Sequence, residues 1–126
     1  MASKSQDTVL KTINPEEINP SNPTEFARRG WAYYYHQDFS KAREDFLQAL
    51  QSDPRNIDFQ YGLALTLKLM GKSQEAVQAF EKILGQIDDT DDRVKGTMLK
   101  RLTLGHINQL TQGNWNLGEL VWQRKA

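Results

Sequence analysis

The feature that most constrains this chain is an internal repeat with a period of 34 residues. Shifting the sequence by that length places Tyr33 on Leu67 and Phe46 on Phe80. Further coincident pairs are Gly30 with Ala64, Ala42 with Ala76, Ala49 with Ile83, and Leu50 with Leu84. Many of the matched positions are three, four or seven residues apart, which is the spacing of one face of an α-helix. Each repeat is therefore predicted to form two amphipathic helices that pack as a hairpin.

Glycine and proline mark the ends of the predicted helices, which cover residues 23–36, 40–51, 58–70 and 73–84. Pro54 closes the first unit, because proline cannot continue a helix. Gly71 stands where a left-handed helix end favours glycine. Gln37 occupies the equivalent place in the first unit. If the backbone is left-handed there, Gln37 costs about 1 kcal/mol relative to glycine.

The two units resemble the tetratricopeptide repeat family. That family's 34-residue unit has a small residue within its first helix, an aromatic residue after it, an alanine opening the second helix and a closing proline. The first unit matches this pattern at Phe26, Gly30, Tyr33, Phe39, Ala42, Phe46, Ala49 and Pro54. The second unit departs from it, because Ile87-Asp88 stands in place of Asp-Pro. The resemblance implies an all-α fold, a right-handed superhelical stack of antiparallel helical hairpins.

We expect the remaining residues to add an arm and a third hairpin to the two repeats, which span 23–56 and 57–90. Residues 1–22 are predicted to form an extended or disordered N-terminal arm. After the acidic run at 88–92, a long amphipathic pattern has its stripe at Met98, Leu102, Gly105 and Gln109, and Leu99, Ile107 and Leu110 add further apolar area. We interpret residues 91–126 as a degenerate capping hairpin. Its last helix would contain Leu117, Leu120, Val121 and Trp122.

The composition favours one cytoplasmic domain. The chain has 126 residues, 38% of them apolar, and its 16 basic and 16 acidic residues cancel. A formal net charge of zero argues against nonspecific binding to nucleic acid. No apolar run approaches the length of about 18 residues that spans a membrane. The absence of cysteine removes disulfides and thiolate metal sites.

No motif in the sequence predicts catalysis. The acidic run at 88–92 lacks the spacing and glycine of a helix-loop-helix calcium site. His36 and His106 are single histidines without a second ligand at zinc-binding spacing. A glycine-rich phosphate loop and a nucleophile elbow are also missing. We therefore expect no catalytic residue, no metal, no cofactor and no enzyme activity.

The predicted binding site is a groove lined by the first helix of each repeat. At 3.6 residues per turn, side chains opposite the hairpin contact face away from the core. In the first unit these are Ala27, Trp31, Tyr34 and Tyr35, and in the second they are Tyr61, Leu65 and Lys68. Aromatic residues dominate binding hot spots, and monomers seldom leave a large apolar patch exposed. The expected partner is a protein or peptide segment with apolar side chains, bound by a noncatalytic adaptor.

Other interpretations of the same aromatic residues remain open. They could pack against the N-terminal arm or a neighbouring repeat of the same molecule. They could also hold two copies together in a homodimer, as in a self-assembling structural protein or an assembly chaperone. The family resemblance raises a further possibility, because many relatives bind the carboxylate tail of a heat-shock chaperone. The matching positions here, Ala27, Trp31 and Gly62, offer no charged or amide donor, so we do not expect that ligand.

Overall fold

The computed structural model describes residues 12–87 and 93–112 of the 126-residue chain. Its elements are a short 3-10 helix, η1 (Pro15–Glu17), and five α-helices: α2 (Pro23–Tyr35), α3 (Phe39–Ser52), α4 (Ile57–Leu69), α5 (Ser73–Ile87) and α6 (Arg93–Gln112). The described part contains no strand. The all-α stack of helical hairpins expected from the repeat is confirmed.

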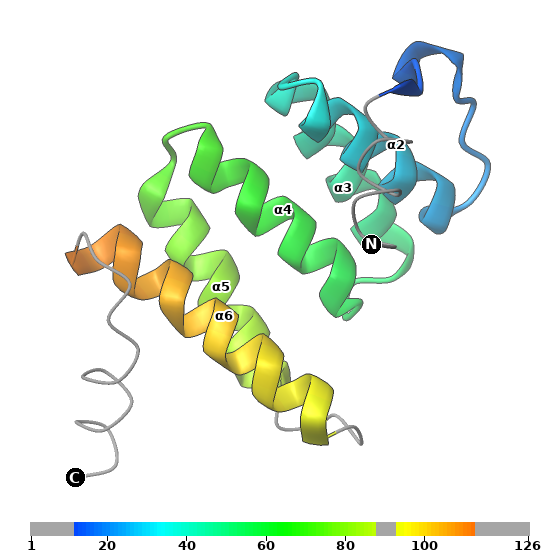
Figure 1. Cartoon of the computed structure of the whole chain (residues 1–126). Helices are drawn as coiled ribbons and strands as arrows, with labels where there is room; N and C mark the ends of the chain where they lie inside the picture. Colours follow the sequence, from blue (N-terminus) through cyan, green and yellow to red (C-terminus); the bar gives the residue numbers. More distant parts are fainter. Residues whose placement is uncertain (1–11, 88–92, 113–126) are drawn as a thin grey trace, which may run out of the picture.

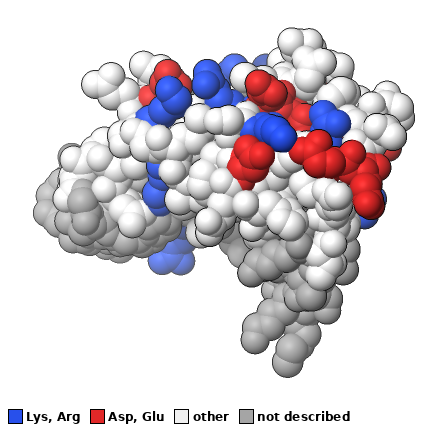
Figure 2. Space-filling model, turned by 90° about the horizontal axis from the view of Figure 1, so that it is seen from above, with Lys and Arg blue, Asp and Glu red and all other residues white. Residues whose placement is uncertain are grey.

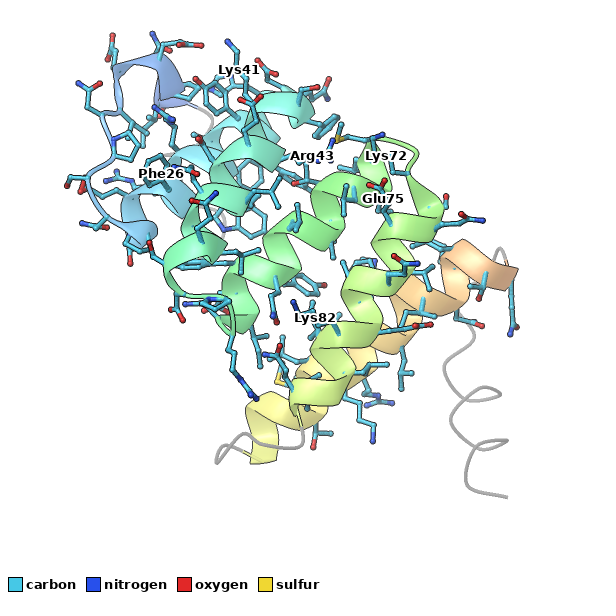
Figure 3. All side chains as sticks on the ribbon, turned by 180° about the vertical axis from the view of Figure 1, so that it is seen from behind. Phe26, Lys41, Arg43, Lys72, Glu75 and Lys82 are labelled. Atoms are coloured by element: carbon cyan, nitrogen blue, oxygen red, sulfur yellow. The ribbon has the colours of Figure 1, made fainter. Side chains whose placement is uncertain are left out.

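The helices form two layers (Figure 1). α2 pairs with α3 and α4 pairs with α5, and contacts of α3 with α4 and of α5 with α6 continue the stack. Seen from behind, α3 and α5 lie in front (Figure 3). The opposite layer consists of α2, α4 and α6. We call the outer surface of this second layer the three-helix face.

Each of the first two hairpins turns at a residue with left-handed backbone. Gly71 has φ of 79° and Gln37 has φ of 64°. Gly71 meets no atom within 4 Å of the position that a Cβ would take. Only glycine adopts this conformation without a steric penalty from Cβ, so the strain expected at Gln37 is present in the first hairpin.

The core consists of two clusters that follow the repeat. Phe46 is fully buried in the first cluster and Phe80 in the second. Leu63 packs against both clusters and so links the two units. The backbone of α4 lies close to Phe46 at Gly62, where a Cβ would lie 2.5 Å from the ring. This contact fixes the distance between α3 and α4.

Residues 12–22, the described part of the arm, contact the first hairpin. Arg29 donates two hydrogen bonds of 2.8 Å to the carboxylate of Asp45 and one of 3.2 Å to the carbonyl oxygen of Ile18. Lys41 pairs with Glu16 at 2.8 Å. These contacts attach the described part of the arm, which includes η1, to helices α2 and α3.

The amphipathic pattern of α6 is confirmed in part. Met98 and Leu102 of the expected stripe are 60% and 44% exposed, and Gln109 is exposed as well, so these members were wrong. Gly105 is buried. Ile107 belongs to the second core cluster, and Leu99 and Leu110 pack against it, as expected of the further apolar residues of the pattern. The predicted last helix lies outside the described residues.

None of the helices in the described ranges is both long enough and apolar enough to span a lipid bilayer.

Candidate functional site

Three aromatic residues of the predicted groove form one cluster on α2. The Trp31 ring lies 5.4 Å from that of Tyr34 and 6.4 Å from that of Tyr35, measured between centroids. Trp31 also contacts the buried ring of Phe46 edge-on at 5.1 Å. All three groove residues are half-buried. Trp31 and Tyr34 pack against the first core cluster, whereas the ring of Tyr35 contacts those two rings, and all three keep part of their surface accessible.

The other predicted groove residues differ in how much surface they expose. Ala27 is only 4% exposed and belongs to the first core cluster, so it offers little surface to a partner. Leu65 is half-buried against the second cluster. Tyr61 and Lys68 are also half-buried, and both contact α6. The predicted groove thus includes residues of α2 and α4 but omits the α6 residues that contact Tyr61 and Lys68.

A polar cluster joins α4 to α6 in the middle of the three-helix face. The Nε2 atom of His106 lies 2.9 Å from the Tyr61 hydroxyl oxygen, and its Nδ1 atom lies 2.9 Å from Lys68 Nζ. Lys68 also donates a hydrogen bond to Oε1 of Gln109. We call Tyr61, Lys68, His106 and Gln109 the polar centre. The two ring nitrogens of His106 bridge a tyrosine and a lysine of the same neighbouring helix.

The polar centre holds His106 in its neutral form. Its ring stacks on Phe80 with centroids 4.8 Å apart and planes 6° from parallel. Burial, and next the positive charge of Lys68, lower the pKa of His106 from its ordinary value of 6.5 to about 4. Burial also raises the pKa of Tyr61 and lowers that of Lys68. The imidazole is therefore uncharged near neutral pH, and the phenol keeps its proton.

Acidification is expected to destabilise the protein through His106. Between pH 6.5 and about 4, the unfolded chain's imidazole binds a proton that the folded one does not, so the free energy of unfolding falls as the pH falls through this window. Allowing for the partial exposure of the ring, we expect a loss of about 1 to 2 kcal/mol. Urea denaturation at several pH values measures it. His106→Gln is the control, and an equal loss in both proteins would contradict the prediction.

Exposed apolar side chains concentrate on α4 and α6. Among the described residues, four large apolar side chains are exposed, and three of them, Leu69, Met98 and Leu102, belong to these helices. Met98, Leu102 and Gln109 recur four and seven residues apart and so share one side of α6. Gln109 contacts Lys68 of α4, so this side borders the three-helix face.

The opposite layer is polar by comparison. Lys41 and Arg43 of α3 and Lys82 of α5 appear on it when the molecule is seen from behind (Figure 3). Viewed from above, basic and acidic side chains lie next to one another rather than in separate patches (Figure 2). The fourth exposed apolar residue, Leu47, is on α3. Among the described residues, three of the four exposed large apolar side chains thus lie on α4 and α6, while lysine and arginine side chains are visible on α3 and α5.

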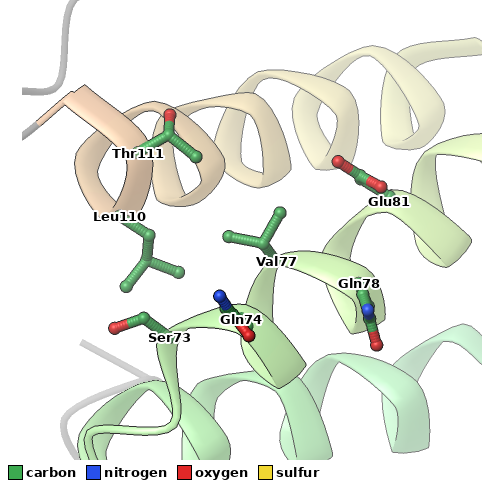
Figure 4. Close-up of a pocket in the computed structure, with 7 residues that line it drawn as sticks. All are labelled: Ser73, Gln74, Val77, Gln78, Glu81, Leu110 and Thr111. Atoms are coloured by element: carbon green, nitrogen blue, oxygen red, sulfur yellow. The ribbon is translucent and has the colours of Figure 1, made fainter.

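A pocket of about 320 Å³ lies away from the predicted groove, between α5 and α6 (Figure 4). Val77 and Leu110 provide its apolar lining, and polar side chains such as Gln74 and Glu81 surround them. Within the described ranges, no three His, Asp or Glu side chains are grouped closely enough to hold a metal ion. The pocket lining thus mixes apolar with polar side chains.

The fold and the three-helix face define the chain as a helical repeat protein built from stacked hairpins. A family model described as "Tetratricopeptide repeat" matches residues 28–92, about half of the chain. The chain belongs to the tetratricopeptide repeat family. Proteins of this family are typically noncatalytic modules for protein–protein interaction.

A curated relative carries the same repeat. A TPR repeat-containing protein of Methanocaldococcus jannaschii is 36% identical over 56 residues. That match covers 44% of this chain and 10% of the relative. The matched region therefore represents about one tenth of that protein, and the likeness concerns the repeat alone.

Proposed function

We propose that this chain is an adaptor that binds an apolar peptide or protein segment on the three-helix face. The observation that carries the proposal is the distribution of exposed apolar side chains: Leu69, Met98 and Leu102 lie on α4 and α6, and the aromatic cluster of α2 continues the same face. Monomers seldom expose such a surface without a use for it. A bound segment would bury it.

Trp31 is the proposed main anchor of the bound segment. It combines a large ring with a T-shaped contact to the buried ring of Phe46, so little side-chain freedom is lost on binding. Trp31→Ala is expected to weaken binding by on the order of 2 kcal/mol, or about 30-fold. The probe is the peptide of highest affinity that a displayed random library yields on the wild-type protein, and calorimetry measures its dissociation constant.

Leu47→Ala is the matched control for Trp31→Ala. Leu47 is 42% exposed, but it lies on α3 in the other layer. We expect its loss to leave peptide affinity unchanged. Circular dichroism establishes that both variants are folded at the temperature of measurement, because Trp31 also contributes to the core. Unchanged affinity in a folded Trp31→Ala protein would exclude this face as the binding site.

Self-association is the alternative use of the same surface. Exposed Leu69, Met98 and Leu102 could equally be covered by a second copy of the chain. Light scattering over a dilution series separates the two cases. A protein that stays monomeric at the highest concentration, and that binds the selected peptide one to one, supports the adaptor.

A further inference from the structure

At the end of the stack away from α4, the first hairpin holds main-chain carbonyl groups of the arm (Figure 1). His36 Nε2 lies 2.9 Å from the carbonyl oxygen of Ile13, and because a carbonyl group only accepts, the imidazole is the donor. Arg29 donates to the carbonyl oxygen of Ile18 at 3.2 Å. Asp45 fixes the guanidinium in this direction by accepting two hydrogen bonds from it. Two side chains of α2 thus bind the arm on either side of η1.

The same end of the hairpin binds one carboxylate of the arm. Glu16 Oε1 lies 2.8 Å from Lys41 Nζ, and Lys41 also pairs with Asp38 at 3.8 Å. The Tyr33 hydroxyl donates a second hydrogen bond to Glu16. These donors, Lys41 first and Tyr33 next, lower the pKa of Glu16 below its ordinary value of 4.5. Pro15, the residue before Glu16, is buried. The arm thus has one buried side chain and, next to it, one paired carboxylate.

The donors that hold the arm lie away from the three-helix face. We call these four residues the arm site: Arg29, Tyr33, His36 and Lys41. The three on α2 recur four and three residues apart, so they share one side of the helix. At about 3.6 residues per turn, Trp31 and Tyr35 of the aromatic cluster are on the opposite side of α2. The fourth donor is on α3, which belongs to the other layer. The arm site is therefore separate from the proposed adaptor surface.

Comparison of the two repeat units shows that the arm site is special to the first. A shift of 34 residues places its members, in the same order, on Leu63, Leu67, Met70 and Glu75. These are three apolar side chains and a carboxylate, which do not donate hydrogen bonds. Leu63 packs against both core clusters, so in the second unit the preceding hairpin covers this side. The second unit forms its hairpin without the donors, so the fold does not require them. What they share in the first unit is contact with the arm.

We propose that the arm site is a second peptide-binding site, for an extended segment in which a proline precedes an acidic residue, and that the arm is its tethered ligand. Asn14 and Ile18, which flank η1, have extended backbone. Binding through main-chain groups, with side chains providing the specificity, is a common mode of peptide recognition. The side chains of Lys41 and Glu16 are 50% and 61% exposed, so their pairing is weak. A segment of the same chemistry therefore displaces the arm.

The tether determines how well a free segment competes. A ligand on a short linker acts at an effective concentration in the millimolar range. A free peptide that makes the same contacts as the arm must approach that concentration to displace it from the wild-type protein. A variant whose own arm is repelled leaves the site open. Its apparent affinity for the free peptide should rise by the factor by which the arm is released.

Charge reversal in the full-length protein tests the contact. Glu16→Lys and Lys41→Glu each place like charges at this position and should release the arm. Amide exchange at Glu17 and Ile18, whose N–H groups donate within η1, measures the release. We expect exchange about three- to tenfold faster in each single variant and wild-type exchange in the double variant. Glu17→Lys is the matched control, because Glu17 is an exposed neighbouring carboxylate, and it should not release the arm.

Free peptides of residues 12–19 test binding by calorimetry. The native peptide should bind the Glu16→Lys protein about three- to tenfold more tightly than the wild-type or Glu17→Lys protein, in which the arm competes. The peptide that carries the Glu16→Lys change should instead prefer the Lys41→Glu protein. Such a reversed preference requires that the two positions contact each other in the complex.

Three results would overturn the proposal. The first is an arm that exchanges equally fast in the wild-type and Glu16→Lys proteins. The second is a native peptide that does not bind the Glu16→Lys protein even at millimolar concentration. The third is a pair of peptides that do not distinguish the two single variants. The library-selected peptide should bind all these proteins with wild-type affinity, so the arm site and the adaptor surface succeed or fail separately.

Discussion

Gly62→Ala is expected to lower the free energy of unfolding by about 2 to 3 kcal/mol. The added Cβ would lie 2.5 Å from Cε1 and 2.6 Å from Cζ of Phe46. Because Phe46 is fully buried, its ring has no free space in which to move away. Either α4 must move away from α3, or the ring must leave its preferred rotamer. Alanine favours a helix over glycine by about 1 kcal/mol, so the clash must exceed that gain for the expected loss to appear.

Gly85→Ala is the control for this prediction. Gly85 is also within a helix, α5, but no atom lies within 4 Å of its virtual Cβ. We expect this variant to gain about 0.5 to 1 kcal/mol of stability. Urea denaturation compares the two proteins. Adding Phe46→Leu to Gly62→Ala should make the combined loss smaller than the sum of the single losses. A Gly62→Ala protein as stable as Gly85→Ala would contradict the expected clash.

The Gly62 contact also bears on the three-helix face. Contact between α3 and α4 sets how far α4 lies from the first hairpin. The distance from the aromatic cluster on α2 to Tyr61 depends on this spacing. A Gly62→Ala protein that remains folded should therefore bind the selected peptide more weakly, although Gly62 itself is buried and contacts no ligand.

Helices α2 to α5 could be predicted from the sequence because the same two-helix pattern occurs in both repeat units. Phe46 and Phe80 occupy equivalent places in the core clusters, and the left-handed residues Gln37 and Gly71 occupy equivalent turns. The pattern of apolar and turn residues in one unit therefore supports the helices predicted in the other. α6 has no such partner within the described residues, and the spacing left both Met98 and Ile107 as apolar candidates. Only the packing of α6 on α5 decides that Ile107 is buried and Met98 exposed.

The polar centre could not be predicted, because its members are far apart in the sequence. Lys68 lies 38 residues from His106 and 41 residues from Gln109. In the sequence, His106 has no second ligand at zinc-binding spacing, and its neighbours along the chain do not identify another partner. A weaker signal was available, since a histidine between apolar residues of an amphipathic helix needs a hydrogen-bonding partner when it is buried. The identity of that partner depends on how α6 lies against α4.

Comparing the two units could have predicted the ion pair between Arg29 and Asp45. In the second unit the equivalent positions hold Leu63 and Ala79, both packed against the second core cluster. A charged pair has thus replaced an apolar contact at the same place in the hairpin. Finding two opposite charges together at positions that are apolar in the other unit predicts that they bind each other.

Asp45→Ala is expected to lower the free energy of unfolding by about 2 to 3 kcal/mol. The carboxylate accepts two hydrogen bonds from Arg29 and its side chain is only 5% exposed. Removing it leaves the guanidinium half-buried without its counter-charge. Because the Arg29 side chain is 25% exposed and water can reach it, the loss should fall below that of a fully buried pair. Urea denaturation measures the loss.

The double variant Arg29→Leu with Asp45→Ala separates the cost of an unpaired charge from the worth of the pair. It installs the residues that the second unit already accommodates, so we expect stability within about 1 kcal/mol of the wild type. A double variant as unstable as Asp45→Ala would show instead that the pair itself contributes the stability. The arm responds differently, because Arg29 also holds the Ile18 carbonyl. Limited proteolysis near residue 18 should be faster in the double variant, even where its global stability is restored.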